Sequence, residues 1–130
     1  MSDTRHVPND KPFNIRERLL VFACDIVNVA QKLHTRGPVA GSLSVQLVNA
    51  AVSAAANMEE ADDPSGDRDF RAKARISLRE IKEARMRLRV LRGTGFLDGA
   101  DAALIQEAAE LKKIVATIIR NNHRRSTEGA

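Results

Sequence analysis

The sequence predicts an all-α protein with an up-down-up-down antiparallel four-helix bundle. Three observations support this fold. The 130-residue chain has no Trp or Tyr and is rich in Ala, Leu, Val, Ile and Arg, which favours helix over sheet. Apolar residues recur at spacings of three and four along four segments, and short breaks separate those segments. We therefore predict one domain, a bundle over residues 13–123, between flexible tails at 1–12 and 124–130.

The first predicted helix begins at Asn14, which forms a capping-box-like start with Glu17, and ends before Gly37-Pro38. Its apolar residues alternate between spacings of four and three, so they share one stripe. That stripe consists of Ile15, Leu19, Phe22, Ile26, Val29 and Leu33. The chain's one cysteine, Cys24, is expected to fill core space in a reducing compartment.

The second predicted helix runs from about Val39 to Asp62 and contains most of a 22-residue stretch, Gly37 to Met58, without any charge. One apolar stripe holds Leu43, Leu47, Ala50, Ala54 and Asn57, and the other holds Val45, Val48, Val52 and Ala55. Two stripes need two partners, so we expect this helix to be covered by its own bundle and by another subunit. Six Ser, Asn and Gln side chains within the uncharged stretch argue against a membrane span.

The third predicted helix, Asp67 to Arg92, follows a break at Asp63-Pro64-Ser65-Gly66 and ends at Gly93-Thr94-Gly95. Its stripe is Phe70, Ala74, Ser77, Ile81, Ala84, Leu88 and Leu91. The fourth predicted helix is capped by Asp98 or Asp101. Its stripe is Leu104, Ala108, Leu111, Val115 and Ile118, widened by Ile105, Ile114 and Ile119. Short loops between such helices make neighbours antiparallel.

Charge is concentrated on the third predicted helix, which carries ten of the 21 basic residues and a net charge of +6. At about 100° per residue, eight of these cations share an arc of about 140°, and Asp69, Glu80 and Glu83 lie outside it. The basic strip consists of Arg68, Arg71, Arg75, Arg79, Lys82, Arg85, Arg89 and Arg92. Such a strip repels itself, a cost usually accepted where phosphate or carboxylate groups neutralise it. Its arginines suit bidentate phosphate binding.

We predict that the basic strip contacts the backbone of RNA or DNA, with strong salt dependence and little sequence preference. Base stacking is poorly supported, because only Phe96 of the four Phe residues is expected in a loop. Two alternatives stay open. Acidic residues of the neighbouring helices, Glu59 to Asp63 or Glu107 and Glu110, pair with part of the strip within the oligomer, or the strip is a solvated face.

The sequence predicts no enzyme, no cofactor and no metal site. None of the three histidines has a Glu three residues before it, so the Glu-x-x-His ligands of di-iron bundles are missing. No Gly-rich loop follows a strand, which argues against a nucleotide-phosphate cradle. We interpret Asn57, an amide on a core stripe, as an interhelical hydrogen bond that fixes register, with a binding role as the alternative. The first 13 residues lack the apolar core of a secretory signal, which favours the cytoplasm.

Four segments carry a likeness to a known family. They are Phe13-Asn14-Ile15-Arg16-Glu17-Arg18, Ser53-Ala54-Ala55-Ala56-Asn57-Met58-Glu59-Glu60-Ala61, Asp69-Phe70 followed by Leu78-Arg79-Glu80-Ile81-Lys82-Glu83, and Glu107-Ala108-Ala109-Glu110-Leu111. In order and spacing, from about Phe13 to Arg120, the chain resembles the four-helix-bundle family of the 23S ribosomal RNA intervening-sequence proteins. The resemblance implies an up-down bundle that assembles as a homopentamer. Nucleic-acid binding is the usual proposal for that family's unsettled role.

A more distant resemblance is to the accessory protein of diversity-generating retroelements, a basic pentameric bundle that assists a reverse transcriptase and its RNA. It implies an alternative function, a scaffold whose basic face docks an acidic protein partner such as a reverse transcriptase. The chain departs from the intervening-sequence family at Met86-Arg87, where members commonly have an aromatic residue followed by Trp. The added Arg favours an electrostatic role over an apolar groove. The sequence thus predicts a non-enzymatic, cytoplasmic homo-oligomer that binds a nucleic-acid backbone.

Overall fold

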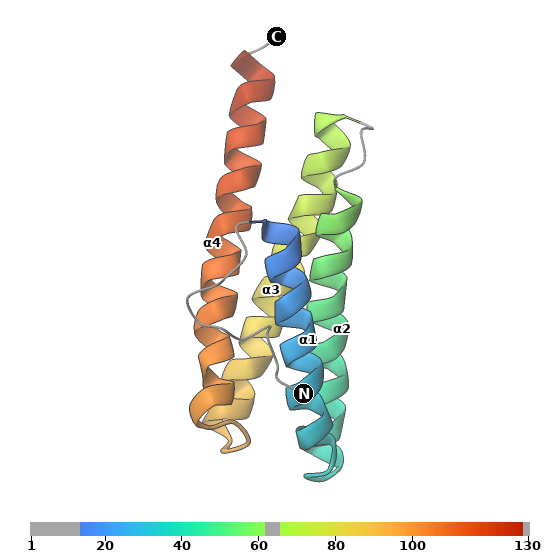
Figure 1. The fold of residues 1–130 in the computed structure, drawn as a ribbon, viewed down its shortest axis with the longest axis vertical. Coiled ribbons are helices and arrows are strands. Elements are labelled where there is room, and N and C mark those ends of the chain that lie inside the picture. The colour runs from blue at the N-terminus through green and yellow to red at the C-terminus, as the bar shows by residue number, and fades with distance from the viewer. Residues whose placement is uncertain (1–13, 62–65, 129–130) are drawn as a thin grey trace.

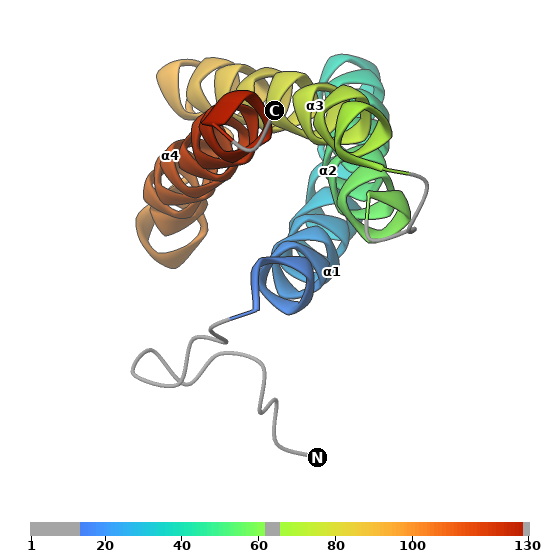
Figure 2. The ribbon, with the colours of Figure 1, turned by 90° about the horizontal axis from the view of Figure 1, so that it is seen from above.

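A computed structural model of the chain describes residues 14–61 and 66–128. They form four α-helices, which are α1 (Ile15–His34), α2 (Pro38–Glu60), α3 (Asp67–Gly93) and α4 (Gly99–Glu128). Consecutive helices run in opposite directions and follow one another around the bundle, so α1 and α4 are neighbours on the remaining side (Figures 1 and 2). The predicted all-α four-helix bundle is confirmed. The predicted N-terminal tail, Phe13, the break at 62–65 and residues 129–130 lie outside the described residues.

The core is aliphatic and uses the predicted stripes. Five of the six stripe residues of α1 are buried, as are all but Phe70 in α3. From α2, small residues contribute most of the contact surface, since Ala50, Ala51 and Ala54 are buried beside Leu47. Small side chains let α2 approach α1 and α3 closely, which keeps the narrow bundle densely packed. In α4 the sequence pattern was less accurate, because Ile119 is buried in place of Ile118.

The helix ends mostly follow the predicted signals. The Asn14 side-chain oxygen accepts a hydrogen bond from the Arg16 backbone N–H at 2.8 Å, and Gly37 has a φ of 117° that favours glycine. The last helix differs, because α4 continues past the predicted boundary at residue 123 to Glu128. The Arg124 guanidinium donates to Asn121 at 2.8 Å within this extension. Arg124 and Arg125 are therefore helical.

Two salt-bridge groups connect α1 to α4. The Arg18 guanidinium donates two hydrogen bonds of 2.8 Å to Glu107 and one of 2.7 Å to Glu110. The hydrogen bonds that Arg18 donates to Glu107 raise the pKa of Arg18 above its usual range. Nearer the other end of α1, Lys32 donates to Asp101 at 2.6 Å. These pairs join α1 and α4, which pack less extensively than the other neighbouring helices of the bundle.

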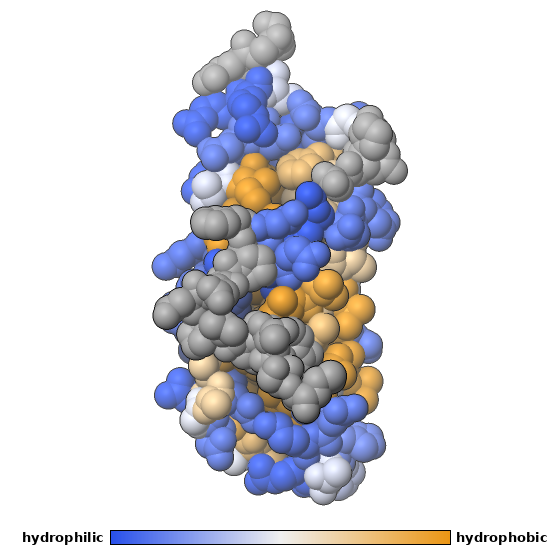
Figure 3. All heavy atoms as spheres, viewed as in Figure 1, coloured by the Kyte–Doolittle hydropathy of each residue, from blue (hydrophilic) through white to orange (hydrophobic). Residues whose placement is uncertain are grey.

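One side of α2 remains exposed in the single chain. Val39, Val45 and Val52 are 68%, 53% and 46% exposed, and Figure 3 shows apolar surface over the side formed by α1 and α2. Its own bundle therefore does not cover this side of α2, and the expected coverage by another subunit stays a prediction. By length and hydropathy α2 also meets the criteria for a membrane-spanning helix, which core helices of soluble proteins meet as well.

The amide of Asn57 does not make the predicted interhelical bond among the described residues. It is half-buried, and its Nδ2 donates within α2 to the Ser53 carbonyl at 2.9 Å and to Ser53 Oγ at 3.2 Å. A nearby contact between helices comes instead from Ser77, whose buried hydroxyl donates to the Ala54 carbonyl of α2 at 2.8 Å. The stripe pattern placed Ser77 in the core but did not show that its hydroxyl makes a hydrogen bond between helices.

Replacing Arg18 with Ala should destabilise the bundle, because it removes three hydrogen bonds to Glu107 and Glu110. The Arg18 and Glu107 side chains are only 13% and 17% exposed, so we expect the free energy of unfolding to fall by about 2 kcal/mol. Lys32→Ala is the matched control, since it removes an exposed pair between the same helices and should cost less than about 1 kcal/mol. Urea denaturation measures both losses. Equal losses would contradict the structural role of Arg18.

Candidate nucleic-acid interface

Contacts on its two sides fix how α3 is rotated in the bundle. Toward α2, Lys73 donates to Glu60 at 3.1 Å and the buried Ser77 packs on the α2 backbone. Toward α4, the Arg71 guanidinium donates to Asn122 Oδ1 at 2.9 Å. The arc of α3 opposite its buried apolar stripe faces solvent. The basic strip lies mainly on that outer arc and along its α4 side.

Six of the eight strip residues are exposed, and the other two, Arg71 and Arg85, are half-buried. The exposed cations are Arg68, Arg75, Arg79, Lys82, Arg89 and Arg92. None of these six forms a hydrogen bond or an ion pair with another described residue. Arg79 interacts electrostatically with Glu80 and Glu83, and the other five cations are available to an anionic ligand.

The two half-buried members of the strip, Arg71 and Arg85, differ in their contacts. Arg71 bonds to Asn122, whose own amide donates to Asp67 at 3.4 Å. Asp67 falls within the angular range of the strip, so the separation of cations from anions at the start of α3 is less complete than the sequence pattern indicated. The buried Nε of Arg85 has no hydrogen-bond acceptor among the described residues. Arg71 and Arg85 thus contribute their positive charge to the interface, but their side chains are less available than the six exposed ones.

The acidic residues that could neutralise the strip are used elsewhere in the described chain. Glu107 and Glu110 bind Arg18 of α1, and Glu60 binds Lys73 on the α2 side of α3. Asp62 and Asp63 lie outside the described residues. Within one chain, Glu60, Glu107 and Glu110 therefore bind cations that lie outside the strip, and pairing between subunits stays a prediction.

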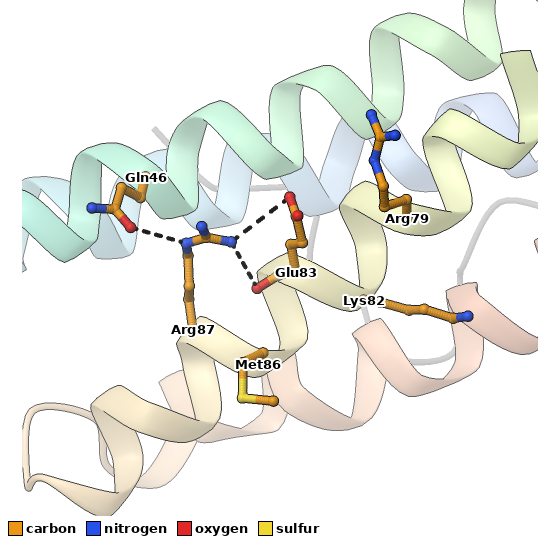
Figure 4. A pocket seen from close by; sticks show the side chains of 6 residues that line it. All are labelled: Gln46, Arg79, Lys82, Glu83, Met86 and Arg87. Carbon is orange, nitrogen blue, oxygen red and sulfur yellow. Dashed lines mark hydrogen bonds and ion pairs between the residues drawn. The ribbon is translucent and has the colours of Figure 1, made fainter.

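An open groove of about 530 Å³ between α2 and α3 borders the strip. Arg87 crosses it, donating to Gln46 and to the Glu83 carbonyl at 3.3 Å each, while Met86 is 57% exposed. Figure 4 shows Lys82 pointing away from Gln46 and Arg87. Six residues line the groove, namely Gln46, Arg79, Lys82, Glu83, Met86 and Arg87. Arg87, which the sequence pattern placed outside the strip, is thus held between helices by polar contacts.

A pair of carboxyl groups lies next to this groove. Glu80 and Glu83 share a hydrogen bond, which raises the pKa of Glu80 and lowers that of Glu83. A hydrogen bond from Ser53 of α2 opposes the rise at Glu80. Since Asn57 also bonds to Ser53, a polar chain runs from α2 to the solvent edge of α3. Sequence spacing alone placed both carboxyls off the strip without revealing that they shift each other's pKa in opposite directions.

Possible metal-binding and nucleophilic groups are dispersed. The described residues contain no group of three His, Cys, Asp or Glu side chains suited to a metal ion. His34 and His123 are exposed, Cys24 is half-buried, and His6 lies outside the described residues. The sequence prediction of no metal, no cofactor and no catalytic residue stays a prediction.

Comparison with known proteins assigns the family. The family model for the 23S rRNA-intervening sequence protein matches residues 11–117. The chain belongs to this family. The predicted resemblance to it is thereby confirmed, whereas the more distant one to retroelement accessory proteins stays a prediction. No curated protein matches the chain.

The fold is also found in a solved structure. A protein with unknown function of the S23 ribosomal protein family, from Bacteroides thetaiotaomicron, is 27% identical and aligns with a TM-score of 0.75. The alignment covers 82% of this chain and 98% of that one. This member of the 23S rRNA-intervening sequence protein family therefore shares its bundle architecture with that protein.

The Glu80–Glu83 pair should give the protein a specific pH dependence. Because the folded state raises the pKa of Glu80 above 4.5, it favours protonated Glu80, so this group adds stability as the pH falls through its raised pKa. Glu83 has a lowered pKa, so its contribution to the stability of the fold is lost as the pH falls through that pKa. Glu80→Gln should therefore be more stable than the wild type at neutral pH.

Urea midpoints measured across the acidic range test this dependence. The advantage of Glu80→Gln should shrink as the pH falls toward the raised pKa of Glu80. Glu59→Gln, at an exposed position of α2, serves as the control and should follow the wild-type profile. An advantage of Glu80→Gln that stays constant with pH would contradict the raised pKa of Glu80.

Proposed function

We propose that this protein is a non-enzymatic, oligomeric accessory protein of the cytoplasm that binds the backbone of RNA or DNA through the basic strip of α3. One observation carries the proposal: six exposed cations of one helix make no hydrogen bond or ion pair with a described residue, and only Arg79 among them interacts with nearby acids, Glu80 and Glu83. Unneutralised cations on one surface repel one another, and a polyphosphate backbone relieves this repulsion while releasing its counterions. Arginine predominates, which matches the planar geometry of phosphate.

Oligomerisation is part of the same proposal. The exposed side of α2 carries valines and no charged residue between Pro38 and Met58, a composition suited to a subunit interface. A homopentamer is what the family resemblance implies. Repeating a basic strip around such a ring would convert weak phosphate contacts into avid binding.

A protein scaffold is the second candidate, and the groove between α2 and α3 favours it. Exposed Met86 lies among Arg79, Lys82 and Arg87 there. An acidic segment that also presents an apolar side chain fits this combination. A reverse transcriptase is one such partner in the more distant resemblance. Weak, salt-insensitive nucleic-acid binding together with retention of an acidic protein would favour this candidate.

Removing exposed strip cations should weaken nucleic-acid binding. Arg75→Gln combined with Lys82→Gln takes away two positive charges that no described residue uses. We expect affinity for RNA and DNA to fall by roughly tenfold or more, and the slope of log affinity against log salt to decrease by about 2. Fluorescence anisotropy at salt concentrations between about 50 and 200 mM covers the sensitive range.

The matched control lies on the same helix. Lys73→Gln with Arg87→Gln removes the same residue types and the same charge, but from side chains that contact Glu60 and Gln46 on the α2 side. This control should retain most of the affinity and of the salt slope. If both double variants lose binding equally, net charge rather than the strip determines affinity.

Introducing Glu at Val45 or Val52 should separate the subunits. Both valines are about half exposed in the single chain, so the charge is tolerated by the fold but would be buried without a partner in an interface. We expect helicity by circular dichroism to be kept and the mass by light scattering to fall to that of one 14.3 kDa chain. Gln31→Glu, on an exposed part of α1, should leave the mass unchanged. A wild-type monomer would overturn the oligomer proposal.

A further inference from the structure

A second group of cations lies on α4. No acidic residue occurs between Glu110 and Glu128, whereas five Lys and Arg residues do. They are Lys112, Lys113, Arg120, Arg124 and Arg125, of which only Lys112 is half-buried. The net charge of the whole helix is small, because acids in its first half balance most of these cations. The sequence therefore does not single out the basic second half.

Contacts with α1 fix the rotation of α4. Glu107 and Glu110 bind Arg18, so their side of the helix faces α1. At about 100° per residue, Lys113 and Arg120 lie on the outer surface, turned by about 100° from that side and away from α1. They are exposed on the part of α4 that adjoins α3.

The hydrogen bond between Arg71 and Asn122 sets the level of α4 against α3. Because the helices are antiparallel, each step forward from Arg71 corresponds to a step back from Asn122. Arg120 therefore lies within about one helical turn of the level of Arg75, and Lys113 within about one turn of the level of Lys82. On each helix the two cations are seven residues apart, which corresponds to about 10.5 Å along the helix axis.

We define Arg75, Lys82, Lys113 and Arg120 as the four-cation face. All four side chains are exposed, and none has an acidic partner among the described residues. Glu80 and Glu83 are the acids of α3 nearest in sequence to Arg75 and Lys82. They lie toward α2, on the side of the strip away from α4, and interact with each other. The face thus presents two parallel rows of positive charge.

We propose that the four-cation face binds a nucleic-acid double helix, with the α3 row on one backbone strand and the α4 row on the other. The inference rests on the proposed function and specifies its ligand. Packed helix axes lie about 8–10 Å apart, and exposed side chains diverge further, so the rows have a separation comparable to the width of the B-DNA major groove, about 12 Å. A double helix offers two phosphate strands at such a spacing.

A single strand fits this face less well. One flexible backbone can follow one row at a time, and proteins that bind single strands add aromatic side chains on which bases stack. The described residues provide no such stacking group on the face: Phe22 is buried and Phe70 is half-buried, while Phe13 lies outside the described part of the chain. Phe96 lies beneath the guanidinium of Arg36, 5.0 Å from the ring centroid. Binding must then come from the backbone phosphates.

Titrations of the full chain with a DNA duplex, an RNA duplex of the same sequence and each single strand test the proposal. The key variant is Lys113→Gln with Arg120→Gln, compared with Arg75→Gln with Lys82→Gln. An equal change in charge is provided by Asn28→Asp with Gln31→Glu, at exposed positions of α1. Circular dichroism confirms that each variant keeps its helices.

We expect the wild type to bind duplexes more tightly than single strands, and the α4 variant to lose roughly tenfold in duplex affinity with a salt slope lower by about 2. The α1 control should stay near wild type. A preference for one duplex would identify RNA or DNA as the ligand within the proposal. Loss in the α3 variant with wild-type duplex binding by the α4 variant, or equal affinity for single strands, would overturn the double-helix inference alone. Absence of binding to every probe would overturn the proposed function as well.

Discussion

Burial of the α3 apolar stripe is the constraint on which the other features of the molecule depend. Ala74, Ile81, Ala84, Leu88 and Leu91 are almost completely buried against α2 and α4. Rotating α3 enough to bury one of its cations would expose this stripe, at a cost of roughly 1.5–3 kcal/mol for each large aliphatic side chain. The core therefore holds the basic strip on the outside. No favourable interaction among the cations is needed to keep them there.

The electrostatics of the bundle are separated in space. Arg18 binds Glu107 and Glu110 on the α1 side of α4, and Lys73 binds Glu60 on the α2 side of α3. Acids that could have neutralised the outer arc of α3 are thus committed to other cations. A strongly basic chain, with a formal net charge of +4, consequently displays its surplus on the surface shared by α3 and α4.

The exposed side of α2 and the basic surface differ in chemistry and therefore in suitable partners. Valines without neighbouring charges favour association through apolar contact, which depends weakly on salt. Arg and Lys side chains on α3 and α4 favour polyanions, with strong dependence on salt. Because the two surfaces occupy different helices, assembly and ligand binding can be disturbed separately. Membership of the 23S rRNA-intervening sequence protein family is compatible with this division of surfaces.

The sequence by itself determined the number of helices, most of their ends, the apolar stripes and the concentration of charge on α3. These features follow from periodicity and capping within one segment, which local spacing encodes. Only the tertiary structure decided which charges remain without partners. Arg18 meets Glu107 across 89 positions of the chain, and Arg71 meets Asn122 across 51. Such pairs depend on the rotation and level of helices distant in sequence, which no single helical period specifies. The same reason explains why the cations of α4 joined those of α3 only in the folded chain.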